Sequence, residues 1–197
     1  GIMGWADLLY QLEIPYDSEE ALSLAEKVME FIDYHAKEYS SILADKLGAF
    51  PNFKNSIYEQ KTLIRQNNNK NWQNLKDTLA KKGIRNATVT TIAPTGTISM
   101  IANTSGGIEP QFSLVYVKNV MDGEKLLYIN PYFKKAMKEK GLYSKKLMEK
   151  IAKAGSVAEI DEIPEDLKKI FVTSHDIAPE WHIRMQAAFQ KYTDNAV

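Results

Sequence analysis

The residues best suited to chemistry in this 197-residue chain form one short loop near its centre. The loop reads Pro94-Thr95-Gly96-Thr97-Ile98-Ser99. The β-branched run at residues 87–92 before it predicts a buried strand, and the apolar residues 100–102 after it predict a short helix. A helix start presents backbone N–H groups without intrahelical partners, and the helix dipole adds partial positive charge there. The pattern therefore favours binding of an anion such as a phosphate.

Individual residues of this loop support the same interpretation. Gly96 carries no side chain that would keep a phosphate away from the backbone. Thr95, Thr97 and Ser99 add hydroxyl donors, and Pro94 stiffens the entry to the turn. The loop is not a Walker A sequence, because no Gly-Lys-Ser/Thr follows it. Local chemistry leaves a second interpretation open, in which the Thr and Ser side chains only cap the helix of an unliganded turn.

Other reactive side chains give weaker signals. The chain has no cysteine, which excludes disulfides, thiolate zinc sites and thiol nucleophiles within it. No metal site is expected, because His35, His175 and His182 include no pair at helical i, i+4 spacing. Glu109 either lines an active site or is a buried acid satisfied by neighbouring backbone. The lysines of residues 134–153 are interspersed with acids, which is typical of a solvated face.

Composition narrows the class of protein. The 25 basic and 25 acidic residues give zero formal net charge, so a nucleic-acid partner is not expected. No apolar run is long enough to span a bilayer, and no membrane partner is expected. The first residues lack the basic and apolar regions of a signal peptide. These features predict a cytoplasmic globular protein.

Hydrophobic periodicity predicts mostly helices. The first thirteen residues indicate a short helix. A long helix follows, capped by Asp17 with Glu20 as the capping-box acid and ended by Gly48. Its expected buried stripe comprises Leu22, Ala25, Val28, Met29, Ile32, Ala36, Tyr39 and Leu43.

The remaining chain is predicted to mix strands with helices. A polar surface loop at residues 66–71 leads to a helix over residues 72–82, which Gly83 ends. Residues 112–120 and 126–129 are predicted strands joined by a turn at Asp122-Gly123. Further helices are expected after Asn130-Pro131 and from Pro179. Without a linker or repeat, this order predicts one α/β layer or barrel with parallel strands.

Residues 85–99 resemble the phosphate-loop signature of ribonucleotide reductase large chains. Residues 107–110, Gly-Ile-Glu-Pro, resemble a Glu-Pro element of that family, and residues 129–131 continue in the same order. Both ends also resemble family segments, at residues 1–16 and 182–197. The sequence Thr-Gly-Thr-Ile-Ser and the Phe-containing predicted strand after Pro110 are most similar to those of the adenosylcobalamin-dependent reductases, class II of this family.

The resemblance implies both a fold and a function. Residues 1–197 would be a single fragment, the later half of a ten-stranded α/β barrel. The parent enzyme would make deoxyribonucleotides from ribonucleoside diphosphates or triphosphates by radical chemistry, with adenosylcobalamin as cofactor. The backbone of Pro94, Thr95, Gly96, Thr97 and Ile98 would hold the substrate phosphates, and the Ser99 hydroxyl would assist. The implied partners are a ribonucleotide, the remainder of the reductase chain and a second copy in a homodimer.

One departure from the family pattern limits this inference. The family uses a cysteine that becomes a thiyl radical and a cysteine pair that supplies electrons, and no residue here matches them. We therefore expect no catalytic residue in this chain, a fragment that is inactive by itself, and a reductase only as the longer parent. A different class of function stays open: a non-catalytic phosphate-binding or assembly module.

Overall fold

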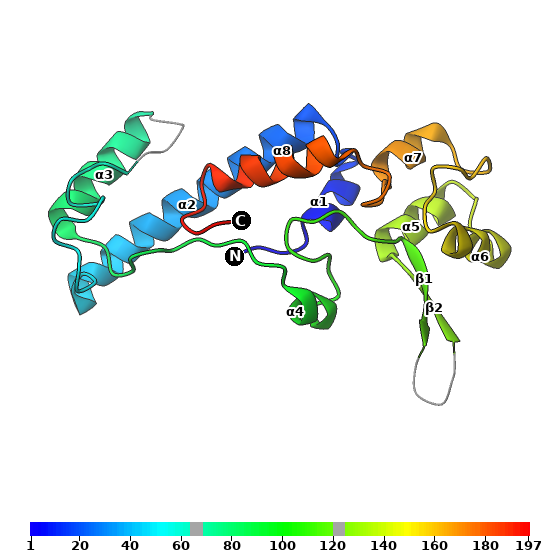
Figure 1. The fold of residues 1–197 in the computed structure, drawn as a ribbon, viewed down its shortest axis with the longest axis horizontal. Helices are drawn as coiled ribbons and strands as arrows, with labels where there is room; N and C mark the ends of the chain where they lie inside the picture. Colours follow the sequence, from blue (N-terminus) through cyan, green and yellow to red (C-terminus); the bar gives the residue numbers. More distant parts are fainter. Residues whose placement is uncertain (64–68, 120–124) are drawn as a thin grey trace. The chain divides into compact units, whose positions relative to one another are not determined.

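The structure, a computed structural model, describes residues 1–63, 69–119 and 125–197. Its described elements run in the order α1 Trp5–Leu12, α2 Glu19–Leu47, α3 Lys70–Lys82, α4 Gly96–Ile101, β1 Val115–Asn119, β2 Lys125–Ile129, α5 Pro131–Glu139, α6 Lys145–Ala154, α7 Glu165–Ile170 and α8 Pro179–Gln190 (Figure 1). The chain divides into two compact units. The first contains Gly1, Ser23–Ile92 and Gln186–Val197, and the second contains Ile2–Leu22 and Ala93–Met185.

Helix ends follow local sequence signals, with one correction. Ser18 rather than Asp17 caps α2, because its hydroxyl oxygen accepts a hydrogen bond from the Ala21 amide at 3.1 Å. Ser18 directly precedes the first helical residue, so Glu20 does not stand at the capping-box position. Gly48 follows α2 with a φ of 78°, as predicted for a glycine that ends a helix.

The buried face of α2 is more polar than the predicted stripe. Ala25 and Met29 are buried as expected, but Tyr39 is 62% exposed. The next buried positions at four-residue spacing are Asp33 and Lys37, both fully buried. The stripe was predicted from apolar residues alone, so charged residues on the same face were overlooked.

Helix α3 covers the predicted residues 72–82 and begins two residues earlier. The Asn69 side chain accepts a hydrogen bond from the Trp72 amide at 3.1 Å, and Gly83 ends the helix as expected. Trp72 is buried, and its indole N–H donates to Glu30 at 2.8 Å. The predicted surface loop at residues 66–71 lies partly outside the described residues.

Residues 87–92 are not a strand, although their composition predicted one. In the described part of the chain, the single strand pairing is the antiparallel ladder of β1 and β2, and residues 87–92 have no ladder partner. The expectation of parallel strands is not met within those residues either. A β-branched run favours an extended backbone, but a strand also needs a neighbouring strand for its hydrogen bonds.

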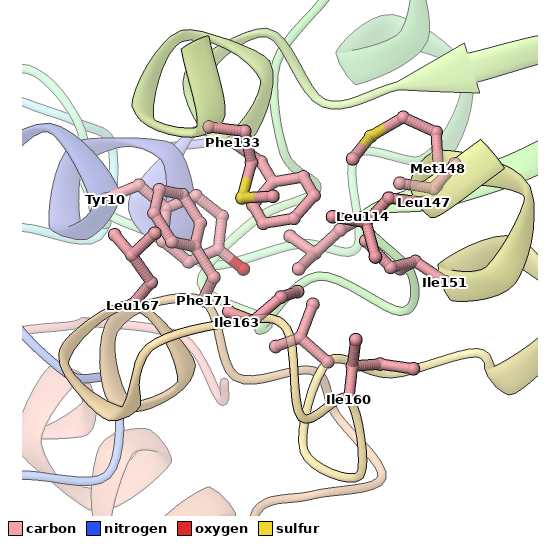
Figure 2. Close-up of a cluster of buried hydrophobic side chains, with 13 residues drawn as sticks. Tyr10, Leu114, Phe133, Leu147, Met148, Ile151, Ile160, Ile163, Leu167 and Phe171 are labelled. Carbon is pink, nitrogen blue, oxygen red and sulfur yellow. The ribbon is translucent and has the colours of Figure 1, made fainter. Parts of the chain in front are cut away.

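The second unit contains a large cluster of buried hydrophobic side chains (Figure 2). Side chains from α1, β1, α5, α6 and α7 and from residues next to them meet there, among them Tyr10, Leu114, Phe133, Met148, Ile151 and Phe171. Strand β1 occupies part of the predicted residues 112–120, and β2 confirms the predicted return strand. The predicted Asp122-Gly123 turn lies outside the described residues.

Helices α5 and α6 present lysines outward, as expected for a solvated face. Lys135 and Lys145 are exposed and approach Glu139 and Glu149 one turn later. The start of α5 is also as predicted. Asn130 caps it by accepting hydrogen bonds from the amides of residues 132 and 133 at 3.0 and 3.1 Å, and a proline occupies the first turn.

Candidate functional site

The loop at residues 94–99, called the phosphate loop below, makes a tight turn into α4. Thr95 adopts a left-handed conformation with a φ of 53°, and α4 begins at Gly96. The Ser99 amide donates to the Thr95 carbonyl at 2.8 Å. The Ser99 hydroxyl donates to the Gly96 carbonyl at 2.9 Å, so it points back into the helix. Where the sequence predicted a strand, a turn and a helix, the structure has an irregular segment, a left-handed residue and a short helix.

The start of α4 leaves backbone donors open. In the described part of the chain, the amides of Gly96, Thr97 and Ile98 have no hydrogen-bond acceptor, as expected in a helical first turn. All three residues are exposed. A Cβ atom added at Gly96 would meet no atom within 4 Å. A ligand can therefore reach these amides from solvent without displacing a side chain.

A second loop, residues 104–107, packs against the phosphate loop and is called the supporting loop below. The Gly107 amide donates to the Thr95 hydroxyl oxygen at 2.7 Å. A Cβ atom at Gly107 would lie 2.8 Å from the Ala93 carbonyl oxygen, and one at Gly106 would lie 3.2 Å from that of Pro94. Because Gly107 also has a φ of 40°, glycine is required where the two loops touch.

Thr95 keeps one hydrogen-bonding function free in this arrangement. Its hydroxyl oxygen serves as an acceptor for Gly107, and its proton has no acceptor within the described residues. A hydroxyl can accept and donate at once. The side chain can therefore tie the two loops together and still donate to a bound anion.

A buried acid that sequence reasoning missed holds the supporting loop. Asp7, in the first turn of α1, is 5% exposed. Its carboxylate accepts from the Ser105 amide at 2.8 Å and from the Thr104 hydroxyl at 3.1 Å. Side-chain amides of Gln111 and Asn130 each donate to it at 3.3 Å. An acid in a helical first turn is common for electrostatic reasons, so its sequence position gave no signal of this network.

The side chains of Glu109, His35 and His182 make other contacts, although the Glu109 amide donates to the Gly106 carbonyl of the supporting loop at 3.2 Å. Glu109 is exposed, so of the two interpretations of this residue, the buried acid satisfied by neighbouring backbone is wrong. Burial, with a further contribution from the charge of Glu109, raises the pKa of the neighbouring Tyr16 well above its usual range. His182 approaches the Ser174 carbonyl at 3.2 Å, while His35 pairs with Glu38 at 2.9 Å.

The first unit contains another buried charge cluster that the sequence did not indicate. Lys37 contacts Asp33 on its own helix, and its Nζ lies 2.7 Å from Asp194 Oδ1. The other oxygen of Asp194 accepts from the Val89 amide at 2.8 Å, and the Asp194 amide donates to the Thr90 hydroxyl at 2.9 Å. Asp194 thus supplies hydrogen bonds to Val89 and Thr90 that a neighbouring strand does not supply among the described residues.

A family model described as "Ribonucleotide reductase, barrel domain" matches residues 1–197. The chain belongs to the ribonucleotide reductase barrel-domain family. The family identified from the residues around the phosphate loop is thereby confirmed. The match covers the whole chain and so includes both units and the phosphate loop.

Named relatives agree with this membership. The chain is 45% identical to a "Vitamin B12-dependent ribonucleoside-diphosphate reductase" of Thermoplasma acidophilum, over 100% of this chain and 23% of that protein. It is 40% identical to a protein of the same name from Mycobacterium tuberculosis, over 100% of this chain and 25% of that protein. The chain therefore spans about a quarter of the length of these curated relatives.

A solved structure also matches. The "Actinobacillus ureae class Id ribonucleotide reductase alpha subunit" superposes with a TM-score of 0.73 at 26% sequence identity. The match covers 98% of this chain and 31% of that one. Within the described residues, no helix has the length and apolar character needed to cross a membrane.

Proposed function

We propose that the chain is a segment of a ribonucleoside-diphosphate reductase and that its phosphate loop holds the phosphates of the substrate. The observation that carries the proposal is the first turn of α4, where three exposed residues, 96–98, have backbone amides without an acceptor in the described chain. The relatives named as ribonucleoside-diphosphate reductases support a diphosphate rather than a triphosphate as substrate.

The loop contributes orientation rather than bond chemistry. Amides of Gly96, Thr97 and Ile98 and the Thr95 hydroxyl donate to phosphate oxygens, and the glycine lets those oxygens approach the backbone. The Ser99 hydroxyl assists after it rotates away from the Gly96 carbonyl. Fixing the phosphates fixes the ribose relative to the reactive groups, which raises the effective concentration of the reacting atoms.

The radical chemistry belongs to the parent protein outside this chain. The chain has no cysteine, so neither a thiyl radical nor a reducing thiol pair can form in it. The isolated chain is inactive on this proposal. Both units form part of one ten-stranded α/β barrel, the later half, in which residues 87–92 find strand partners in the rest of the parent.

Adenosylcobalamin is the proposed radical source of the parent, because the 45% and 40% identical relatives are named vitamin B12-dependent. When bound, it supplies the radical that starts the reaction. We assign no residue of this chain to it, since the contacts of His35 and His182 are to Glu38 and the Ser174 carbonyl. The parent is further proposed to be a cytoplasmic homodimer without a nucleic-acid or membrane partner.

The test uses the full-length protein that contains this segment. We expect it to convert a ribonucleoside diphosphate to the deoxy product only when adenosylcobalamin and a dithiol reductant are present. The isolated 197-residue chain should give no product under the same conditions. Product formation without adenosylcobalamin would contradict the cofactor assignment. Absence of both product and substrate binding would contradict the reductase proposal.

A further inference from the structure

The carboxylate of Asp7 is an unusual feature of the second unit because it is buried without a cation. None of the ion pairs in the described part of the chain includes Asp7. Its charge is instead met by four hydrogen-bond donors from Thr104, Ser105, Gln111 and Asn130. A buried carboxylate satisfied in this way fixes the positions of its donors, because losing one hydrogen bond leaves the buried charge less well compensated, which costs free energy.

These contacts lead to the phosphate loop in short steps. Asp7 accepts from the Ser105 amide at 2.8 Å, and the amide of Gly107, two residues later, donates to the Thr95 hydroxyl at 2.7 Å. The start of α1 adds two backbone contacts, from the Gly4 amide to the Ser105 carbonyl at 2.9 Å and from the Trp5 amide to the Gly107 carbonyl at 3.4 Å. The supporting loop is thus held between α1 and the phosphate loop.

The supporting loop packs so closely against the phosphate loop that a movement of one loop must move the other. Added Cβ atoms at Gly106 and Gly107 would lie 3.2 and 2.8 Å from carbonyl oxygens of residues 94 and 93. A shift of the supporting loop toward the phosphate loop would therefore push on its backbone directly. A shift away would break the hydrogen bond to Thr95.

We propose that Asp7 is a positioning residue for substrate binding, acting through residues 104–107 on the backbone that receives the phosphates. This inference rests on the phosphate role proposed above. Asp7 does not touch the substrate; it keeps the left-handed turn at Thr95 and the following amides in one arrangement before the substrate arrives. Such preorganisation strengthens binding, because the conformational entropy of the loop is lost during folding and not when the substrate binds.

The decisive variant is Asp7→Asn in the full-length reductase. Asn130 cannot turn its amide to suit an asparagine, because its oxygen already caps α5 by accepting two backbone hydrogen bonds. The new NH₂ group must therefore face either the Asn130 NH₂ group or the Ser105 amide. We expect the KM for a ribonucleoside diphosphate to rise about tenfold, equivalent to about 1.4 kcal/mol, while kcat changes by less than about twofold.

Tyr10→Phe is the matched control, because it removes a hydrogen bond of a buried side chain on the same helix. The Tyr10 hydroxyl donates to the Val172 carbonyl at 3.2 Å and does not contact the supporting loop. It should leave KM unchanged even where it lowers the unfolding temperature as much as Asp7→Asn does. An equal rise of KM in both variants would overturn the positioning role and indicate a general effect of stability.

A double variant tests the direction of the hydrogen bonds. In Asp7→Asn with Asn130→Asp, the new carboxylate can still cap α5 and can accept from the new NH₂ group at position 7. Recovery of KM to within about threefold of the wild-type value, or about 0.65 kcal/mol, supports the proposal. Failure of the well-folded double variant to recover any of the loss would contradict it.

A milder variant covers the case in which Asp7→Asn does not fold. Thr104→Val deletes one donor to Asp7, at 3.1 Å, and keeps the side-chain shape. KM should then rise about threefold, and an unchanged KM would count against the proposal.

Gly96→Ala, which alters the phosphate loop directly, separates the phosphate-binding role of the loop from the positioning role of Asp7. If it raises KM while the Asp7 and Thr104 variants do not, the phosphate role stands and the positioning role fails; if the wild type does not bind the substrate, the phosphate role fails.

Discussion

Gly96→Ala separates the folding role of the phosphate loop from its binding role. Gly96 lies outside the left-handed region, and an added Cβ would meet no atom within 4 Å. Alanine also favours a helix over glycine by up to about 1 kcal/mol. The variant should therefore fold with an unfolding temperature equal to or slightly above that of the wild type.

Substrate binding should respond in the opposite direction. The new methyl group occupies the space through which a phosphate oxygen reaches the amides of Gly96 and Thr97. A hydrogen bond to a charged group contributes about 1.5–3 kcal/mol, so losing one of them raises KM by about tenfold to about a hundredfold. Steady-state kinetics of the full-length enzyme with a ribonucleoside diphosphate, alongside thermal melting of the same samples, measures both effects.

Gly48→Ala provides the reverse pattern as a control. Gly48 also has open space around it, but its φ is 78°, so alanine is strained there. This variant should lower the unfolding temperature and leave KM unchanged. A Gly96→Ala enzyme that melts normally and keeps the wild-type KM would refute a direct approach of the phosphate to this backbone.

Two further predictions concern buried ionisable groups. Lys37→Met removes the lysine that pairs with Asp33 and Asp194. The free energy of unfolding, measured with denaturant, should fall by about 3–5 kcal/mol. An unfolding midpoint equal to that of the wild type would show that the cluster does not stabilise the fold. Burial, with smaller effects of the charges of Asp7 and Asp176, raises the pKa of Tyr10 above the ordinary value of 10.0. Its unionised phenol therefore stabilises the fold fully below pH 10, and this contribution is lost as pH rises further. Tyr10→Phe should show a shallower loss of stability between pH 10 and 11, and parallel curves for the two proteins would contradict the assignment.

The features that could be predicted from the sequence are those set by neighbours along the chain. Gly48, Gly83 and Asn130 end or begin helices as expected, because caps depend on residues within one turn. Even there, Ser18 replaced Asp17, since two adjacent residues had similar capping ability. A turn followed by a short helix was also predicted here, but α4 begins at Gly96, inside the predicted loop, and ends at Ile101, whereas the sequence placed the helix at residues 100–102.

Features that depend on distant residues were not predictable in the same way. Residues 87–92 have the composition of a strand, but composition does not supply the neighbouring strand. The buried positions of Lys37 and Asp7 depend on partners at residues 194 and 104–105, far along the chain. A single sequence offers no signal for such pairs. Charged residues are mostly exposed, so the residue types of Lys37 and Asp7 by themselves favour the surface.

The carboxylates of Asp7 and Asp194 solve the same physical problem in the separate units. A buried backbone amide needs an acceptor, and in a segment without a strand partner that acceptor must come from a side chain. Asp194 accepts from the Val89 amide at 2.8 Å, and Asp7 accepts from the Ser105 amide at 2.8 Å. Each carboxylate thus holds an irregular segment in one conformation.

The difference between these acids lies in their charge compensation. Asp194 pairs with Lys37, whereas Asp7 depends on neutral donors alone among the described residues. Neutral donors satisfy a carboxylate only in a narrow range of directions, so Asp7 constrains geometry more strictly than an ion pair would. A binding loop gains from that strictness because its amides must already point at the phosphate when the substrate arrives.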